Sequence, residues 1–523
     1  MKFNTKRDKA FPFAGGLDLE SAALSMKPGA MIACKNYECN VLGGYQRVAG
    51  FERLDGQPSP TKAADPTAAR ALIQPVPGSG SVLGVHIFEG DIYAFRNTVA
   101  GNQAKMYKAT TSGWSEVNTP AFNPGGRFEI VNHNYYGNSD GNAMYGVDGK
   151  SLPFKFDGST FEQITPPQDG IYPTHIVAHN YHHFLAYPGG SLIHSNIGDP
   201  STYDAGMGGA GAIGTGADIV GLKVTVGGAL AIFMRNRISL LYGNDATDWQ
   251  KKDVRAQDDL AGAIPHTIQS MNDLFYLDDR GMTSLQHTEA YGNFQASIFS
   301  EQLSRYIASN KHRSIGSIIS RSKNQYRLVI DANGSSEIIT ATFRNNKLAG
   351  LGISSFDPLI SCTAASERSD GTEILLFGAT DGYVYEMDVG TSFDGGGIES
   401  ICKLAYHTYG RDSRRRTRFF YGNIGIEATS SLTLKIKPEF DYGSTDIASH
   451  PNRNNEVLGG GAAWNTKNWN EFLWSVQTYG EALFDIAGVG RNMSLIIYHK
   501  DAVTQPFTLN DATIHYATRG LKR

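Results

Sequence analysis

Gly90-Asp91-Ile92-Tyr93-Ala94-Phe95 decides the fold: a polar, glycine-containing turn leads into a short run of apolar and aromatic residues. Comparable runs return about every 41 to 52 residues through most of the chain, and most of them follow a similar turn. Such turns connect the two strands of a β-hairpin. A period of this length built from strands predicts a β-propeller-like domain of six or seven four-stranded blades, because each blade buries its faces only against its neighbours. The other runs are Ala143-Met144-Tyr145, Phe184-Leu185-Ala186-Tyr187, Leu230-Ala231-Ile232-Phe233, Leu274-Phe275-Tyr276-Leu277, Tyr326-Arg327-Leu328-Val329-Ile330 and Leu375-Leu376-Phe377.

Length and composition fit an all-β protein with more than one domain. A chain of 523 residues exceeds the size at which one core keeps growing, so two or more domains are expected. A hydrophobic content of 41% is enough to form their buried cores. Only 19% of the residues are charged, whereas 59 are glycine. This balance is typical of strands joined by tight turns.

Three parts of the chain differ in pattern. Residues 1–81 form an N-terminal segment that ends in a linker rich in Pro, Ala and Ser, and residues 82–389 hold the propeller-like repeats. In 390–523 the repeat stops and longer alternating strands follow, for example 431–437 and 492–498. Alternation indicates antiparallel sheets with one exposed face. We therefore predict a C-terminal antiparallel β-sandwich or jelly-roll domain.

Charge and hydropathy exclude several classes of protein. The net charge of −4 argues against a chain whose main task is to clamp nucleic acid, since that task needs a basic face. The basic N-terminus is not followed by an apolar stretch of signal-peptide length, and no run is long enough to span a membrane. We expect a soluble chain that is not exported by the usual route. Its four cysteines are too few for a disulfide framework and are expected to be reduced.

We predict no catalytic residue, metal site or cofactor. His175, His179, His182 and His183 are the best metal candidates, because two imidazoles four residues apart share one face of a helix. The segment instead reads as two strands around Asn180-Tyr181, and no nearby carboxylate or cysteine completes a ligand set. Ordinary polar strand positions are the favoured interpretation. Glycoside hydrolysis needs two carboxylates at a definite separation, which a sequence does not reveal.

One basic cluster stands apart from the rest of the chain: Arg411, Arg414, Arg415, Arg416 and Arg418. Arginine binds carboxylates and phosphates with the same bidentate geometry. Three interpretations follow: a contact with another subunit or an adaptor, a solvated edge that prevents strand aggregation, and a surface that faces DNA. The first is favoured, and the third is disfavoured by the negative net charge.

Several phrases occur in a fixed order from one end of the chain to the other. With these phrases, the chain resembles the tail nozzle or hub proteins of short-tailed bacteriophages (podoviruses), also called tail tubular protein B or phage stabilisation proteins. The phrases are Phe13-Ala14-Gly15-Gly16-Leu17-Asp18, Lys27-Pro28-Gly29, Cys34-Lys35-Asn36-Tyr37-Glu38, Gly44-Tyr45-Gln46-Arg47-Val48-Ala49-Gly50-Phe51, the segments 194–203, 276–282, 377–388 and 390–399, and His515-Tyr516-Ala517-Thr518-Arg519-Gly520-Leu521.

The resemblance implies a structural virion protein and carries no catalytic residue to transfer. Such proteins form a homohexameric ring below the portal and its adaptor, the head-to-tail connector. In this chain, the C-terminal domain of residues 390–523 is expected to serve as the ring and adaptor platform. The ring extends the DNA ejection channel, passes double-stranded DNA without binding it specifically, and docks tail fibres or spikes. The implied location is the virion tail, after assembly in the bacterial host cytoplasm. A β-propeller that binds or hydrolyses glycans is the alternative.

Overall fold

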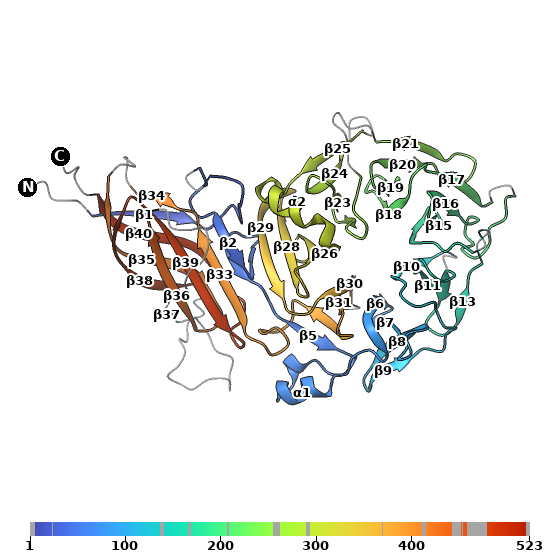
Figure 1. The fold of residues 1–523 in the computed structure, drawn as a ribbon, viewed down its shortest axis with the longest axis horizontal. Coiled ribbons are helices and arrows are strands. Elements are labelled where there is room, and N and C mark those ends of the chain that lie inside the picture. The colour runs from blue at the N-terminus through green and yellow to red at the C-terminus, as the bar shows by residue number, and fades with distance from the viewer. Residues whose placement is uncertain are drawn as a thin grey trace, which may run out of the picture.

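Seven four-stranded antiparallel sheets make up a β-propeller in the computed structural model. The structure describes residues 6–22, 25–135, 141–165, 168, 170–206, 209–254, 262–288, 293–368, 370–409, 415–441, 451, 453–457 and 479–518. The prediction of an all-β, propeller-like fold is confirmed, and the blade number is seven. Figure 1 shows the blades arranged around a centre, with two further sheets to one side.

Six blades are each built from four consecutive strands. Blade 1 holds β6 (Ser79–Phe88), β7 (Asp91–Asn97), β8 (Ala104–Thr110) and β9 (Gly113–Glu116), and blade 2 holds β10 (Glu129–Asn134), β11 (Asn142–Val147), β12 (Phe154–Phe156) and β13 (Phe161–Gln163). Blade 3 holds β14 (His175–His179), β15 (His182–Tyr187), β16 (Ser191–His194) and β17 (Gly211–Gly214), and blade 4 holds β18 (Ile219–Val224), β19 (Leu230–Met234), β20 (Ile238–Tyr242) and β21 (Gln250–Asp253). Blade 5 holds β22 (Gln269–Ser270), β23 (Leu274–Leu277), β24 (Met282–Thr288) and β25 (Asn293–Ile298), and blade 6 holds β26 (Ser314–Ser320), β27 (Gln325–Asp331), β28 (Ser336–Arg344) and β29 (Lys347–Phe356).

The seven apolar runs of the sequence are the second strands of the seven blades. In β15, β19 and β23 every residue is buried. A strand inside a blade is covered by the adjacent blades on both faces, so it is apolar at every position instead of alternating. This is the physical reason that the repeat is visible in the sequence.

Blade 7 is closed by a strand from the N-terminal segment. β30 (Ile360–Glu367), β31 (Glu373–Ala379) and β32 (Val384–Met387) are followed in the sheet by β5 (Phe51–Leu54). Phe51 lies opposite Met387 in the register, and its ring packs against Phe356 and Phe393. The propeller ring is therefore closed by a non-covalent pairing between residues far apart in the sequence.

Strands from both chain ends form two six-stranded sheets. The first sheet holds β1 (Arg7–Pro12), β3 (Tyr37–Cys39), β4 (Tyr45–Arg47), β35 (Thr417–Glu427), β38 (Tyr479–Gly490) and β40 (Thr508–Thr518). The second holds β2 (Met31–Lys35), β33 (Ile398–Leu404), β34 (His407–Thr408), β36 (Leu432–Phe440), β37 (Asn454–Val457) and β39 (Asn492–Asp501). We call them the terminal sheets, and they lie to one side of the blades (Figure 1).

The division of the chain at 81 and 389 does not follow these sheets. Residues 1–81 are not a separate segment, because β1 pairs with β40, β2 with β33, and β5 with β32. One hydrophobic core joins Tyr326 and Leu351 of the propeller to Phe484 and Ile514 of the terminal sheets. The predicted linker contains the short helices η1 (Pro60–Lys62) and α1 (Pro66–Leu72). The remaining helices, η2 (Glu301–Leu303), α2 (Ser304–Asn310) and η3 (Lys311–Arg313), connect blades 5 and 6.

Candidate functional site

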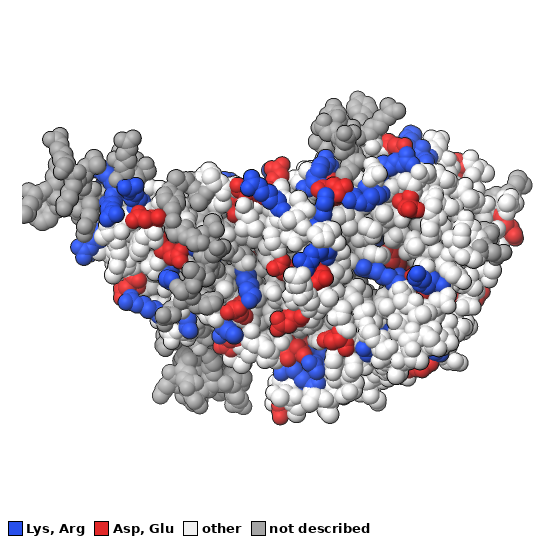
Figure 2. All heavy atoms as spheres, viewed as in Figure 1, with Lys and Arg blue, Asp and Glu red and all other residues white. Residues whose placement is uncertain are grey.

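A cavity of about 280 Å³ lies at the centre of the propeller. Its walls come from the first strand of each of the seven blades or from the residues just before that strand. Figure 2 shows lysine and arginine side chains beside the hollow at this position. We call this cavity the central channel.

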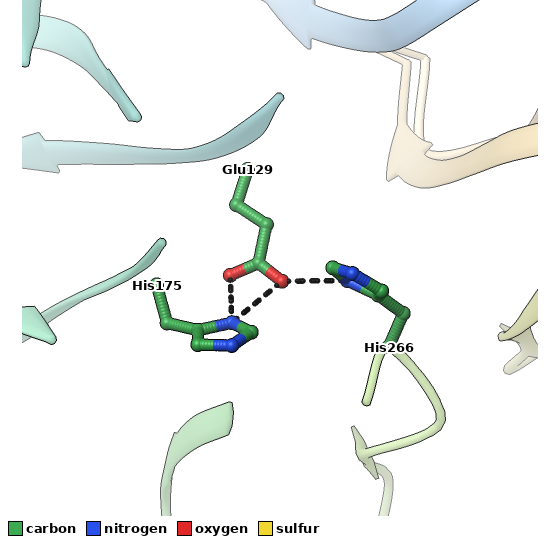
Figure 3. Close-up of side chains that lie close together, drawn as sticks. All are labelled: Glu129, His175 and His266. Carbon is green, nitrogen blue, oxygen red and sulfur yellow. Dashed lines mark hydrogen bonds and ion pairs between the residues drawn. The ribbon is translucent and has the colours of Figure 1, made fainter. Parts of the chain in front are cut away.

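Three side chains from three different blades meet beside the channel (Figure 3): Glu129 and His266 line the channel, and His175 lines an adjoining cavity. Glu129 begins β10 of blade 2, His175 begins β14 of blade 3, and His266 precedes β22 of blade 5. Nδ1 of His175 lies 2.9 and 3.0 Å from the two carboxylate oxygens of Glu129. Nδ1 of His266 lies 2.9 Å from Oε1 of the same carboxylate. One carboxylate thus accepts hydrogen bonds from two imidazoles, and we call these three residues the Glu–His–His cluster.

The cluster favours an ionised carboxylate. Burial alone would raise the pKa of Glu129, but its charge interaction with His175 and the hydrogen bonds from both histidines outweigh burial and hold the pKa well below its usual value. Burial lowers the pKa of His266, and the attraction of Glu129 opposes this effect. Glu129 is therefore a permanent anion that orients two imidazoles.

Two cationic side chains line the same channel. Arg127 borders the channel and two further cavities of about 300 and 350 Å³ at its mouth. Lys223 enters from β18, and burial lowers the pKa of both side chains. No ion pair of either side chain occurs among the described residues, although Glu129 attracts both. The channel therefore carries one carboxylate, the imidazoles of His86 and His266, and two cations, and His175 bonds to the carboxylate from the adjoining cavity.

The four histidines considered as metal ligands, His175, His179, His182 and His183, do not form one group. Asn180 and Tyr181 have positive φ angles of 45° and 58°, the geometry of a two-residue hairpin turn, so the predicted pair of strands is confirmed. His179 and His182 face each other across this hairpin and pack near Trp249. Of these four, only His175 lies beside the channel, where it lines the adjoining cavity of about 300 Å³. Sequence reasoning missed the carboxylate beside it, because Glu129 is 46 residues upstream.

The basic cluster is partly described. Arg411 and Arg414 lie outside the described residues. Arg415 and Arg416 are exposed and precede β35, and Arg418 is exposed within that strand, with its guanidinium 5.5 Å from the ring centre of Phe420. None of the three described arginines lies in the central channel.

Comparisons with known proteins give no family for this chain. No family model matches the sequence, and no curated protein does. Among solved structures, virginiamycin B lyase from Staphylococcus aureus matches with a TM-score of 0.41 and 10% identity, over 65% of this chain and 99% of the lyase. A streptogramin B lyase matches with a TM-score of 0.40 and 12% identity, over 60% of this chain and 95% of its own.

A third match covers more of the chain. The extracellular domain of a putative one-component system from B. thetaiotaomicron has a TM-score of 0.42 and 10% identity, over 83% of this chain and 60% of its own. At these values the likenesses carry no conclusion about activity. In the described part of the chain, no helix is both long and apolar enough to cross a bilayer.

Proposed function

We propose that this chain is a structural virion protein: the tail nozzle or hub of a short-tailed bacteriophage, a homohexameric ring that extends the DNA channel below the portal adaptor and docks fibres or spikes. One observation carries the proposal. Five of the nine phrases that resemble this family are scattered in sequence but contact one another directly in the fold. The residues of these phrases therefore form a framework that holds the fold together internally, and they do not form a surface patch.

Three hydrogen bonds and one ring contact make this framework. Tyr45 Oη donates to the carbonyl of Gly29 at 2.5 Å, and the Tyr45 ring stacks on Phe13 at 5.9 Å between centres. Asn36 Nδ2 donates to the carbonyl of Glu399 at 2.8 Å. The fully buried Arg47 donates to the carbonyl of Thr391 at 3.0 Å. The resembling segments 13–18, 27–29, 34–38, 44–51 and 390–399 are thus held together where the propeller meets the terminal sheets.

The size of the central channel bears on how such a ring conducts DNA. A cavity of about 280 Å³, lined by side chains and crossed by the Glu–His–His cluster, has no room for a duplex. In the proposed assembly the DNA passes between subunits. A closed ring then needs two different patches on each subunit, because its interfaces are heterologous.

The terminal sheets offer two such patches. β38 is the last strand in its sheet, and β35 and β38 expose Tyr421, Tyr479 and Leu483 at 41%, 47% and 67%. Glu481 and Asp485 are exposed on the same face of β38. We call this the β38 face. Arg416 and Arg418 are exposed at the other end of β35, so the arginines of one subunit complement the acidic β38 face of the next.

The glycan-hydrolase alternative gains less support. Glu129 is the only acidic residue among those lining the central channel in the described part of the chain. Asp148, at the mouth, accepts hydrogen bonds from the backbone of Lys150 and Ser151 and shapes a turn. Asp218 lines the same cavity and accepts a hydrogen bond from the backbone of Gly189 at 2.6 Å, so both carboxylates hold turns, whereas glycoside hydrolysis needs a pair that flanks the substrate bond.

Assembly of the full chain on its adaptor tests the proposal. We expect negative-stain images of the purified protein, mixed with its cognate head-to-tail adaptor, to show six-fold rings with an axial opening that admits duplex DNA. The double charge reversal Arg416→Glu and Arg418→Glu should reduce ring formation at least tenfold, because it places like charges against the β38 face. Adding Glu481→Arg and Asp485→Arg should restore rings.

The matched control reverses two exposed lysines on the outermost strand of blade 4, Lys251→Glu and Lys252→Glu, and should assemble normally. A protein that stays monomeric with the adaptor at micromolar concentration contradicts the nozzle function. Rings that form equally well with Arg416 and Arg418 reversed contradict only this choice of interface.

A further inference from the structure

The Glu–His–His cluster has the composition of a transition-metal site. One oxygen of Glu129 and the Nδ1 atoms of His175 and His266 all lie within 4.8 Å of one another. Two imidazoles and one carboxylate are a ligand set that Zn²⁺ and related ions accept, and three protein ligands leave a fourth position open. The set spans 137 residues, which is why sequence spacing gave no sign of it.

The backbone of His266 is a second, independent sign. Its φ angle is 61°, in the left-handed region that residues other than glycine rarely adopt. Its carbonyl accepts a hydrogen bond from the Ser317 amide of blade 6 at 3.0 Å, which holds this conformation. Residues kept in such conformations gather at functional sites, where placing the side chain compensates for the strain. Here the conformation brings an imidazole from blade 5 to a carboxylate from blade 2.

The distances suit a metal after a small adjustment. Around tetrahedral Zn²⁺, with bonds of about 2.0–2.1 Å, ligand atoms lie roughly 3.4 Å apart. Both Nδ1–Oε1 separations are 2.9 Å, so each imidazole has to move outward by about half an ångström. The rings would bind as neutral Nδ1 donors with the proton on Nε2. Hydrogen bonds hold the same three atoms in place when the metal is absent.

We propose that Glu129, His175 and His266 bind one divalent transition-metal ion of the zinc class, with its open coordination position facing the central channel. Arg127 and Lys223 line that channel, so the exogenous ligand at the open position is an anion. The ion would tie blades 2, 3 and 5 together across the propeller. This proposal does not depend on the nozzle function, since it concerns the inside of one subunit.

Metal binding to the full chain tests the proposal. Protein stripped with a chelator and dialysed is titrated with Co²⁺, followed by visible absorption, and then with Zn²⁺ in competition, with metal content measured by mass spectrometry. We expect one ion per chain, a tetrahedral Co²⁺ spectrum displaced by Zn²⁺, and a higher Tm with Zn²⁺ because the ion binds only the folded cluster.

His266→Gly is the decisive variant, because glycine adopts a φ of 61° without strain and the substitution removes one ligand. We expect Co²⁺ affinity to fall at least tenfold while the Tm of the metal-free protein is unchanged or higher. Glu129→Gln should weaken binding as well. Two controls keep the cluster intact: His86→Gln in the same channel, where His86 bonds Asn132, and His312→Gln at an exposed position near the mouth. Both should bind Co²⁺ like the wild type.

Three results would overturn the proposal. One is the absence of stoichiometric Co²⁺ or Zn²⁺ binding by a folded wild-type protein. Another is undiminished binding by both His266→Gly and Glu129→Gln. The third is binding that is lost in His312→Gln but kept in the cluster variants, which would place the ion on the surface.

Discussion

The buried Arg47 guanidinium shows how single polar residues hold this fold together. It is 0% exposed and donates to the carbonyls of Thr504, Thr391 and Asp501, at 2.6, 3.0 and 3.1 Å. Burial lowers its pKa, and the nearby Tyr37 and Asp501 oppose this effect. Three carbonyls at the end of one strand and the start of a loop would otherwise be buried without a donor. Arg47 is therefore a structural residue, and lysine cannot replace it, because a single ammonium group lacks the forked donors of the guanidinium.

His183 predicts a loss of stability in acid. Its side chain is fully buried, and burial lowers its pKa to about 4, whereas an unfolded chain titrates near 6.5. The unfolded state therefore takes up the proton first as pH falls. The folded protein is therefore stabilised above pH ~6.5 and loses this stability as the pH falls to the pKa of His183 in the folded state. Between pH 7 and pH 5 the loss is about 2 kcal/mol. Urea unfolding at both pH values should show a smaller loss for His183→Gln, and an unchanged loss for the exposed His312→Gln. Equal losses in His183→Gln and the wild type would contradict the assignment.

At the scale of elements, the closing strand β5 is the point where the propeller ring depends on distant sequence. Phe51 is 1% exposed and packs within 5.5 Å, between ring centres, of Phe356, Phe377 and Phe393. Phe51→Ala removes this packing and should lower the free energy of unfolding by about 3–5 kcal/mol, whereas truncating the exposed Leu42 to Ala should cost less than about 0.5 kcal/mol. Denaturant titration measures both. Hydrogen exchange should show β5 and β30–β32 becoming less protected together. A cost below about 1 kcal/mol would mean that the ring closes without this residue.

The elements also show what the sequence can and cannot predict. The second strands were found because burial on both faces makes them apolar throughout, as in β15 and β19. The channel strand β10 escaped notice, because it carries polar residues such as Glu129 and Asn132. The pairing of β1 with β40 was missed as well, since it joins Arg7 to Tyr516 and no local pattern encodes so distant a register. The candidate site was invisible for the same reason: its three residues meet only after the ring closes.

For the whole molecule, the remaining question is how it meets DNA. The chain has a net charge of −4, the central channel does not admit a duplex, and the described arginines Arg415, Arg416 and Arg418 lie at one end of a terminal sheet. In the proposed ring these arginines face protein. Free duplex DNA should therefore bind poorly, which also suits a conduit, because tight phosphate contacts would slow the passage of DNA.

Salt dependence distinguishes this arrangement from one in which the basic cluster faces the DNA. If all five arginines from Arg411 to Arg418 held phosphates, the log–log slope of DNA affinity against salt would be about −4.5, at roughly 0.9 counterions per contact. We expect weak binding and a much shallower slope in gel-shift titrations. The triple variant Arg414→Ala, Arg415→Ala and Arg416→Ala should weaken ring assembly more than DNA affinity, because the acidic groups of the neighbouring subunit lose their partners. Strong wild-type DNA binding that this variant abolishes, with rings intact, would place the cluster on the DNA path and move the subunit interface elsewhere.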